Sequence, residues 1–296
     1  MHHYKKEQPV EPRWNKTVRT ATMVDCGDSP VLFSVENGLG RITLNRPARL
    51  NAFNTTMAEE WSRVAQEATA RSDVTAVLIQ ATGNAFCAGG DVLAMAETMR
   101  SGAELRNLAS TINVGVLALI NAPIPVIAAA QGTTAGGGLG ILLATDYAVV
   151  ATNSKLGALY GKIGLTPDLS VSAHLARAVG ERRALQLVLK DRLLSAQEAL
   201  DWGLVAEVVA PEDVNDRASS IASAWIAGAT GAYGQAKRLV RQSAGSSIFD
   251  QLDEEARTIG AAFDTREAAA LIGAFAARSL RVRSHQSDAS RPNRPY

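Results

Sequence analysis

The chain has 296 residues but only two cysteines, Cys26 and Cys87, and a formal net charge of +1. Two cysteines are too few for a disulfide framework, so we expect reduced, unpaired thiols. Because the charge is nearly balanced and no basic stripe alternates with aromatic residues, we expect no binding to nucleic acid. No apolar run reaches the length of a membrane span, and no signal-peptide pattern opens the chain. These absences predict a cytoplasmic protein that does not enter a membrane.

Apolar residues make up 47% of the chain, enough for a globular core. One apolar run, 125–130, precedes three consecutive glycines, Gly136 to Gly138, and a second apolar run follows over 139–144. This pattern predicts a buried strand, a tight turn and a buried helix. Glycine allows a ligand to approach the backbone, and a helix start presents unpaired N–H groups. The turn suits a negative charge developing on oxygen, although close helix–strand packing alone also explains it.

A second turn of the same kind lies upstream. The strand predicted over 76–80 leads through Gly89 and Gly90 into a helix that begins at Val92. Two such turns can each direct one backbone N–H at the same carbonyl oxygen. The pair of turns therefore indicates an oxyanion hole built from two separate segments.

Local patterns predict several further elements. Segment 31–44 is typical of a hairpin that turns at Asn37-Gly38. Apolar residues at helical spacing predict a helix over 55–70, with Trp61 in the core. Ser195 and Glu198 form a capping-box pattern. Later helices are expected over 218–227 and 249–277.

Five segments together resemble the crotonase (enoyl-CoA hydratase/isomerase) superfamily: 45–52, 86–91, 131–138, 163–168 and 194–205. The similarity runs from about residue 31 to about residue 281 in one order. Strands that alternate with helices predict an α/β fold with a parallel sheet. The resemblance implies a crotonase-type spiral of repeated β-β-α units with a C-terminal helical region.

We expect four parts along the chain: a flexible N-terminal arm over 1–28, a spiral core with an acyl-CoA site over 29–205, a helical oligomerisation region over 206–283 and a flexible tail over 284–296. The resemblance also implies a homotrimer or a dimer of trimers.

The resemblance implies an acyl-CoA thioester as substrate, with CoA entering as part of that substrate and no separate cofactor. Gly90 and Gly137 would supply the two N–H groups of the oxyanion hole. Substrate contacts are expected from Arg49, Leu50, Ala52, Ala88, Asp91, Val92, Gly136, Gly140 and Leu165. Asp91 and Asp146 are also candidates for helix caps or ion-pair partners. No histidine or cysteine cluster has the spacing of metal ligands, so no metal is expected.

The acid/base groups are where this chain departs from the hydratases of the superfamily. The two positions that carry glutamate in hydratases are here Gly140 and Tyr160. Hydration needs two carboxylates, so ordinary enoyl-CoA hydration is not expected. Asp168 is the remaining carboxylate, in a segment similar to isomerases of phenylacetate-type CoA pathways. One carboxylate suffices to move a proton between two carbons, so the sequence predicts enoyl-CoA double-bond isomerisation with Asp168 as acid/base.

Alternatives to this prediction stay open. Asp168 fits the N-cap of the following helix, and Tyr160 fits either a hydrogen bond to the acyl group or simple packing. The same segments resemble chlorobenzoyl-CoA dehalogenases, in which the aspartate is a nucleophile in a hydrolytic reaction. The histidine of those enzymes is Asn113 here, and asparagine does not titrate usefully. A non-catalytic acyl-CoA-binding oligomer is the third reading, and the sequence does not specify the acyl group.

Overall fold

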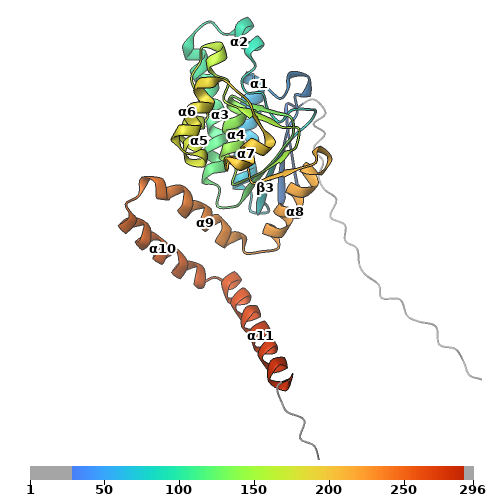
Figure 1. Cartoon of the computed structure of the whole chain (residues 1–296), viewed down its shortest axis with the longest axis vertical. Coiled ribbons are helices and arrows are strands. Elements are labelled where there is room, and N and C mark those ends of the chain that lie inside the picture. The colour runs from blue at the N-terminus through green and yellow to red at the C-terminus, as the bar shows by residue number, and fades with distance from the viewer. Residues whose placement is uncertain (1–28, 290–296) are drawn as a thin grey trace, which may run out of the picture.

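The computed structural model describes residues 29–289, with side chains described as far as residue 278 (Figure 1). The expected N-terminal arm over 1–28 lies outside the described residues. Within them, no helix combines the length and the hydropathy that crossing a membrane requires.

Two sheets form the core of the molecule. The larger sheet has the order β1-β2-β3-β4-β6-β9 and is parallel except for the β1–β2 hairpin. Its strands are β1 (Val31–Glu36), β2 (Leu39–Leu44), β3 (Ala76–Ala81), β4 (Val126–Ala130), β6 (Tyr147–Ala151) and β9 (Glu207–Val209). The smaller sheet is β5 (Thr133–Ala135), β7 (Lys155–Gly157) and β8 (Leu194–Ser195), in that order.

The chain passes repeatedly from the larger sheet to the smaller one. It leaves β4 for β5 and then enters α4 (Gly137–Ala144), and it leaves β6 for β7 before α5 (Val171–Val179). The two strand–strand–helix units lie side by side, because β4 pairs with β6 and β5 pairs with β7, both in parallel. The expected spiral of β-β-α units is confirmed.

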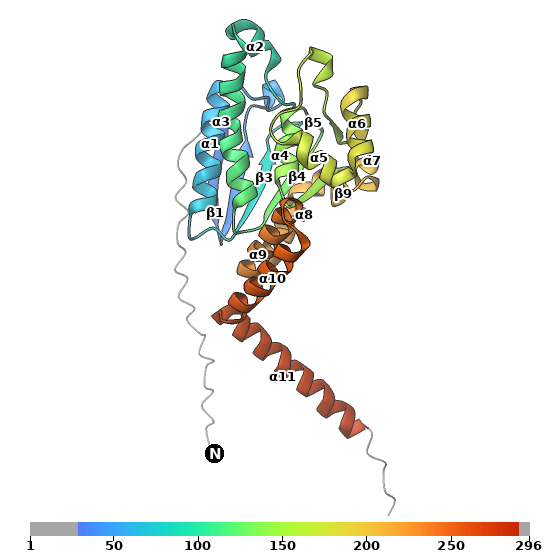
Figure 2. The same cartoon turned by 90° about the vertical axis from the view of Figure 1, so that its left-hand side faces the viewer.

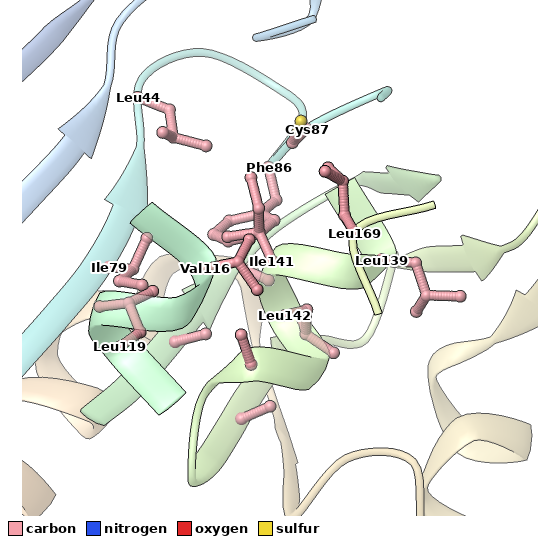
Figure 3. Packing of buried hydrophobic residues seen from close by; sticks show 14 of the residues in the cluster. Leu44, Ile79, Phe86, Cys87, Val116, Leu119, Leu139, Ile141, Leu142 and Leu169 are labelled. Carbon is pink, nitrogen blue, oxygen red and sulfur yellow. The ribbon is translucent and has the colours of Figure 1, made fainter. Parts of the chain in front are cut away.

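Helices cover both faces of the larger sheet (Figure 2). On one face, α1 (Thr55–Ala70) packs against α3 (Gly102–Asn121). Trp61 is fully buried between them, and its indole N–H donates to the Ile112 carbonyl at 3.1 Å. Side chains of α3 and α4, such as Val116 and Ile141, meet Phe86 in the core (Figure 3). The prediction that Trp61 is a core residue is confirmed.

The opposite face of the sheet packs on α8 (Val214–Ile226). Val214, Ala218 and Ala222 form one buried apolar cluster with strand residues that include Leu78 and Ile127. Because β9 and α8 both belong to this layer, the core extends to Ile226. The predicted core boundary at residue 205 is therefore too early.

Three helices follow this core: α9 (Thr230–Gln242), α10 (Ile248–Phe263) and α11 (Arg266–Ala289). We name them the C-terminal arm, because α11 points away from the sheets (Figure 2). The helical segment predicted over 249–277 is divided in the structure: α10 ends at Phe263, and Thr265 caps α11 by accepting the Ala268 N–H at 3.1 Å. Helix α11 also continues past residue 284, where a flexible tail was expected; residues 290–296 lie outside the described range.

The remaining helices are short. They are α2 (Val92–Thr98), α6 (Glu181–Lys190), α7 (Ala196–Asp201) and the 3-10 turns η1 (Pro47–Arg49), η2 (Gly161–Ile163), η3 (Pro211–Asp213) and η4 (Ser243–Gly245). Helix α7 begins with the predicted capping box of Ser195 and Glu198. The predicted hairpin turn is also confirmed, with positive φ at Asn37 and Gly38.

Candidate active site

The two glycine turns predicted from the sequence lie against each other. Gly89 has φ +101° and Gly136 has φ +52°, and both values favour glycine. A methyl group built on Gly89 would lie 2.9 Å from the Ala135 carbonyl oxygen and 3.1 Å from the Gly137 nitrogen. Glycine is therefore needed twice over, for the backbone conformation and for the close contact between the turns.

Hydrogen bonds to Phe53 hold the turn that contains Gly89 and Gly90 in place. The Phe53 N–H donates to the Gly89 carbonyl at 2.7 Å, and the Asp91 N–H donates to the Phe53 carbonyl at 2.9 Å. The fully buried thiol of Cys87 accepts the Gly89 N–H, and burial raises the pKa of Cys87 to about 12. A protonated thiol in this place supports the turn and is not a nucleophile.

The residue after each positive-φ glycine carries a free N–H. Among the residues the structure describes, neither the Gly90 N–H nor the Gly137 N–H donates to a protein acceptor. Gly137 is the first residue of α4, where a helix leaves its N–H groups without internal partners. Both glycines line one cavity. Two unpaired N–H groups beside one cavity can donate to a ligand oxygen, which is the arrangement that stabilises a developing negative charge.

This cavity has a volume of about 460 Å³, within the usual range for a small-molecule site. Its walls come from the two glycine turns, from α2 and α3, and from the segment between β7 and α5. Eight of the predicted site residues line it: Ala88, Gly90, Val92, Gly136, Gly137, Tyr160, Leu165 and Asp168.

Tyr160 and Asp168 form a hydrogen-bonded pair in the cavity wall. The Tyr160 hydroxyl donates to Asp168 Oδ1 at 2.6 Å. Burial raises the pKa of the Asp168 carboxyl above its ordinary value, and the hydrogen bond from Tyr160 offsets part of that rise. Burial, together with the neighbouring Asp168 charge, raises the pKa of Tyr160 well above its usual range. The pair is therefore a carboxylate made more basic than usual and held by a neutral phenol.

This pairing decides between the two structural readings of Asp168. The N-cap residue of α5 is Ser170, and it makes no side-chain cap. The Asp168 carboxylate instead turns to Tyr160, so the side-chain cap expected as an alternative is wrong. Leu169 and Ser170 have φ values of +46° and +66°, a conformation that costs free energy in residues other than glycine. Strained backbone next to Asp168 is typical of a functional segment.

Asp91, predicted as a substrate contact, is instead a structural residue. Its carboxylate caps α2 by accepting the Ala94 N–H at 3.1 Å and pairs with Arg46 and Arg49 at 3.2 and 3.3 Å. Burial alone would raise the pKa of Asp91. The hydrogen bonds and the arginine charge outweigh burial, so the pKa lies below its usual value. The carboxylate is only 4% exposed, so the capping and ion-pair interpretation is confirmed.

Gly140, also predicted as a substrate contact, does not line the cavity. It is buried, because the segment after Asp168 covers it. A methyl group there would lie 2.5 Å from the Leu169 carbonyl oxygen. This position therefore serves backbone packing, and it has no room for the glutamate that the resemblance led us to compare with it.

Three more predicted contacts lie beside the cavity without lining it. Ala52 is buried, whereas Leu50 is 43% exposed on the turn that follows η1. The Arg49 guanidinium is engaged with Asp91 but remains partly accessible. Contact of Arg49 and Leu50 with CoA stays a prediction.

The sequence analysis missed the wall that α2 and α3 contribute. Met95, Leu105, Ala109 and Ile112 line the cavity, and the α3 members follow at intervals of three or four residues. That spacing was visible as an amphipathic pattern. It did not reveal whether the apolar face covers the core or a cavity, because α3 does both.

Comparisons with known proteins identify the family of this chain. The family model described as enoyl-CoA hydratase/isomerase matches residues 34–279. The chain belongs to the enoyl-CoA hydratase/isomerase family, within the crotonase superfamily. A trans-2-decenoyl-[acyl-carrier-protein] isomerase of Streptococcus mutans is 31% identical over 76% of this chain and 87% of its own length.

Other relatives carry different activities in their names. The 1,2-epoxyphenylacetyl-CoA isomerase of Escherichia coli is 31% identical, over 84% of this chain and 95% of its own. The short-chain-enoyl-CoA hydratase of Clostridium acetobutylicum is 30% identical, over 83% and 94%. A Thermobifida fusca structure in complex with CoA superposes with a TM-score of 0.72 at 26% identity, covering 79% of this chain and 93% of that one. This chain is therefore an enzyme of the enoyl-CoA hydratase/isomerase family, and its relatives include isomerases and hydratases.

Proposed function

We propose that this enzyme moves a carbon–carbon double bond in the acyl group of a CoA thioester by transferring a proton to and from carbon. The observation that carries the proposal is the place of Asp168. One carboxylate with a raised pKa lines the same cavity as two unpaired backbone N–H groups.

The steps follow from these groups. The thioester oxygen accepts hydrogen bonds from the Gly90 and Gly137 N–H groups. Asp168 removes the α proton of a β,γ-unsaturated thioester, and the electrons move onto the thioester oxygen as a dienolate. Asp168 then returns the same proton to the γ carbon, which places the double bond in conjugation. Each donor to the oxyanion contributes several kcal/mol of transition-state stabilisation, roughly 3–4 kcal/mol.

Tyr160 has a positioning role in this mechanism. Its hydroxyl is committed to Asp168 at 2.6 Å, so it orients the carboxylate and stabilises the charged form that acts as base. In this proposal the tyrosine reaches the substrate only through Asp168.

The number of carboxylates that line the cavity also disfavours hydration as the reaction. Asp168 is the one carboxylate among the described residues that line the cavity. Hydration needs one group to activate water and another to protonate carbon. The trans-2-decenoyl isomerase among the relatives supports isomerisation of an enoyl group. Other relatives are named hydratases, so the choice between the two reactions rests on the residues of this site.

A homotrimer or a dimer of trimers is proposed as the assembly. The C-terminal arm exposes large apolar side chains, among them Phe249 at 79%, Ile259 at 72% and Phe275 at 71%. Such residues in one region of a monomer are typical of an interface between subunits.

The deciding experiment follows conversion of a 3-enoyl-CoA to the conjugated 2-enoyl-CoA by its ultraviolet absorbance. We expect turnover by the wild type and a loss of about a hundredfold or more in kcat for Asp168→Asn, with the affinity for a saturated acyl-CoA nearly unchanged. Asp213→Asn, an exposed aspartate outside the cavity, is the matched control.

Equal turnover by wild type and Asp168→Asn would show that Asp168 does not carry the proton. Hydrolysis of a halogenated aryl-CoA that disappears in the same variant would instead support Asp168 as a nucleophile. Tight binding of thioesters without turnover of either substrate class would support a binding protein.

A further inference from the structure

The cavity holds two cations that the proposed mechanism does not use. Arg106, Lys162 and Asp168 are the charged residues of its lining. Asp168 is engaged with Tyr160. Within the described part of the chain, neither Arg106 nor Lys162 makes an ion pair or a side-chain hydrogen bond.

Their positions put both cations at the mouth of the cavity. Arg106 stands on the α3 face that also carries Leu105, Ala109 and Ile112. Ile112 is 4% exposed, whereas Arg106, about 9 Å nearer the helix start, is exposed. Lys162 is exposed in η2, two residues after Tyr160, and also lines the cavity. The cavity is therefore apolar inside and positively charged at its rim.

Four basic residues close to the core of this molecule have carboxylate partners. Arg46 and Arg49 pair with Asp91, while Lys237 and Arg241 pair with Asp146. Two unpaired cations that face one ligand cavity fit an anionic group brought by the ligand.

We propose that Arg106 and Lys162 form an anion subsite and that the acyl group of the substrate carries a second carboxylate, which this subsite binds. The inference rests on the proposed acyl-CoA function and names its substrate class. CoA also carries anions, as phosphates. The two cations, however, stand on the segments that bear the apolar wall and the Tyr160–Asp168 pair. The predicted contacts with CoA, Arg49 and Leu50, lie on a different segment, which does not line the cavity.

The experiment measures binding by calorimetry with saturated thioesters, so that it needs no turnover. The probes are glutaryl-CoA and adipyl-CoA, each paired with its neutral counterpart, pentanoyl-CoA and hexanoyl-CoA, together with free CoA. We expect the wild type to bind the better carboxylated probe roughly tenfold more tightly than its neutral counterpart, as two partly exposed charge contacts allow. This preference should weaken as salt is added.

The double variant Arg106→Gln/Lys162→Gln should lose this preference while its affinity for the neutral thioesters and for free CoA stays the same. Arg182→Gln and Lys190→Gln, which remove exposed cations of α6 outside the cavity, should retain the preference.

Two results would overturn the proposal. A wild type that does not prefer either carboxylated probe has no subsite for an acyl carboxylate. A double variant that loses affinity for every thioester and for free CoA alike assigns the two cations to the phosphates. Because the isomerase assay uses neutral 3-enoyl-CoAs and this one uses saturated thioesters, either proposal can fail while the other stands.

Discussion

At the scale of single residues, the chemistry depends on one hydrogen bond in an apolar cavity wall. Asp168 is buried enough for its pKa to rise, and the Tyr160 hydroxyl 2.6 Å away limits that rise. Leu159, Leu169 and Ser170 hold left-handed backbone on either side of the pair. Such strain persists only where the surrounding structure imposes it, so the fold fixes the direction in which the carboxylate points.

The pH profile of the proposed isomerase should report this pair. A base must be ionised, so the acidic limb of kcat/KM follows the pKa of Asp168 in the free enzyme. Burial raises that pKa, so the limb should lie above the ordinary aspartate value of about 3.9. Tyr160→Phe removes a bond that stabilises the ionised form, so the limb should move further toward neutral pH.

Tyr147→Phe is the matched control for this profile. The Tyr147 hydroxyl also donates to a carboxylate, Glu207 at 2.8 Å, but the pair lies outside the cavity. Its removal should leave the acidic limb in place. A limb that stays unchanged in Tyr160→Phe would contradict a charge-stabilising role for Tyr160.

At the scale of elements, one carboxylate joins the C-terminal arm to the sheet. Asp146, directly before β6, accepts the Val126 N–H at 2.8 Å and pairs with Lys237 at 2.9 Å and Arg241 at 2.7 Å. Lys237 also donates to the carbonyls of Leu119 and Ile124. Burial lowers the pKa of Lys237 and Asp146 opposes that effect, so the lysine depends on this partner to remain charged.

Asp146→Asn should therefore lower the free energy of unfolding by about 3 kcal/mol, because it leaves buried cations without their counter-charge. Chemical denaturation measures the loss, and hydrogen exchange should show earlier opening of α9 than of the sheet. Asp73→Asn, which removes the partner of Arg71 on the surface, should change stability little. Equal effects of the two substitutions would mean that the Asp146 cluster does not hold α9.

At the scale of the whole molecule, the C-terminal arm exposes a series of large apolar side chains. Ile248, Phe249, Ile259, Phe263 and Phe275 are all more than 65% exposed. In a soluble monomer, so many large apolar side chains along consecutive helices would favour aggregation. A partner surface that covers them explains the pattern, and the family resemblance favours other copies of this chain.

Phe249→Asp/Phe263→Asp should therefore reduce the proposed trimer or hexamer to smaller species. Light scattering coupled to size-exclusion chromatography measures the mass directly. Leu189→Asp changes a leucine that is 76% exposed on α6, outside the arm, and should leave the assembly intact. A wild-type chain that is monomeric at micromolar concentration would contradict the predicted assembly.

The sequence by itself determined the features that depend on local rules. Positive φ favours glycine at Gly89 and Gly136, and close packing adds to this at Gly89, so both turns were visible as sequence patterns. Local patterns also located three elements: the Asn37-Gly38 turn located the hairpin, the apolar spacing located α1, and the capping box located the start of α7. The missing hydratase carboxylates at Gly140 and Tyr160 could likewise be read directly, because they depend only on residue type.

Only the tertiary structure decided how distant segments meet. It showed that the Asp168 carboxylate turns to Tyr160 and does not cap α5, and that Asp91 is held by Arg46 and Arg49. It brought Arg106 and Lys162, 56 positions apart, to one cavity rim. It also placed β9 and α8 in the core and divided the last predicted helix at Thr265. These contacts join residues far apart in the chain, and side-chain propensities carry no information about which partner a polar group meets after folding.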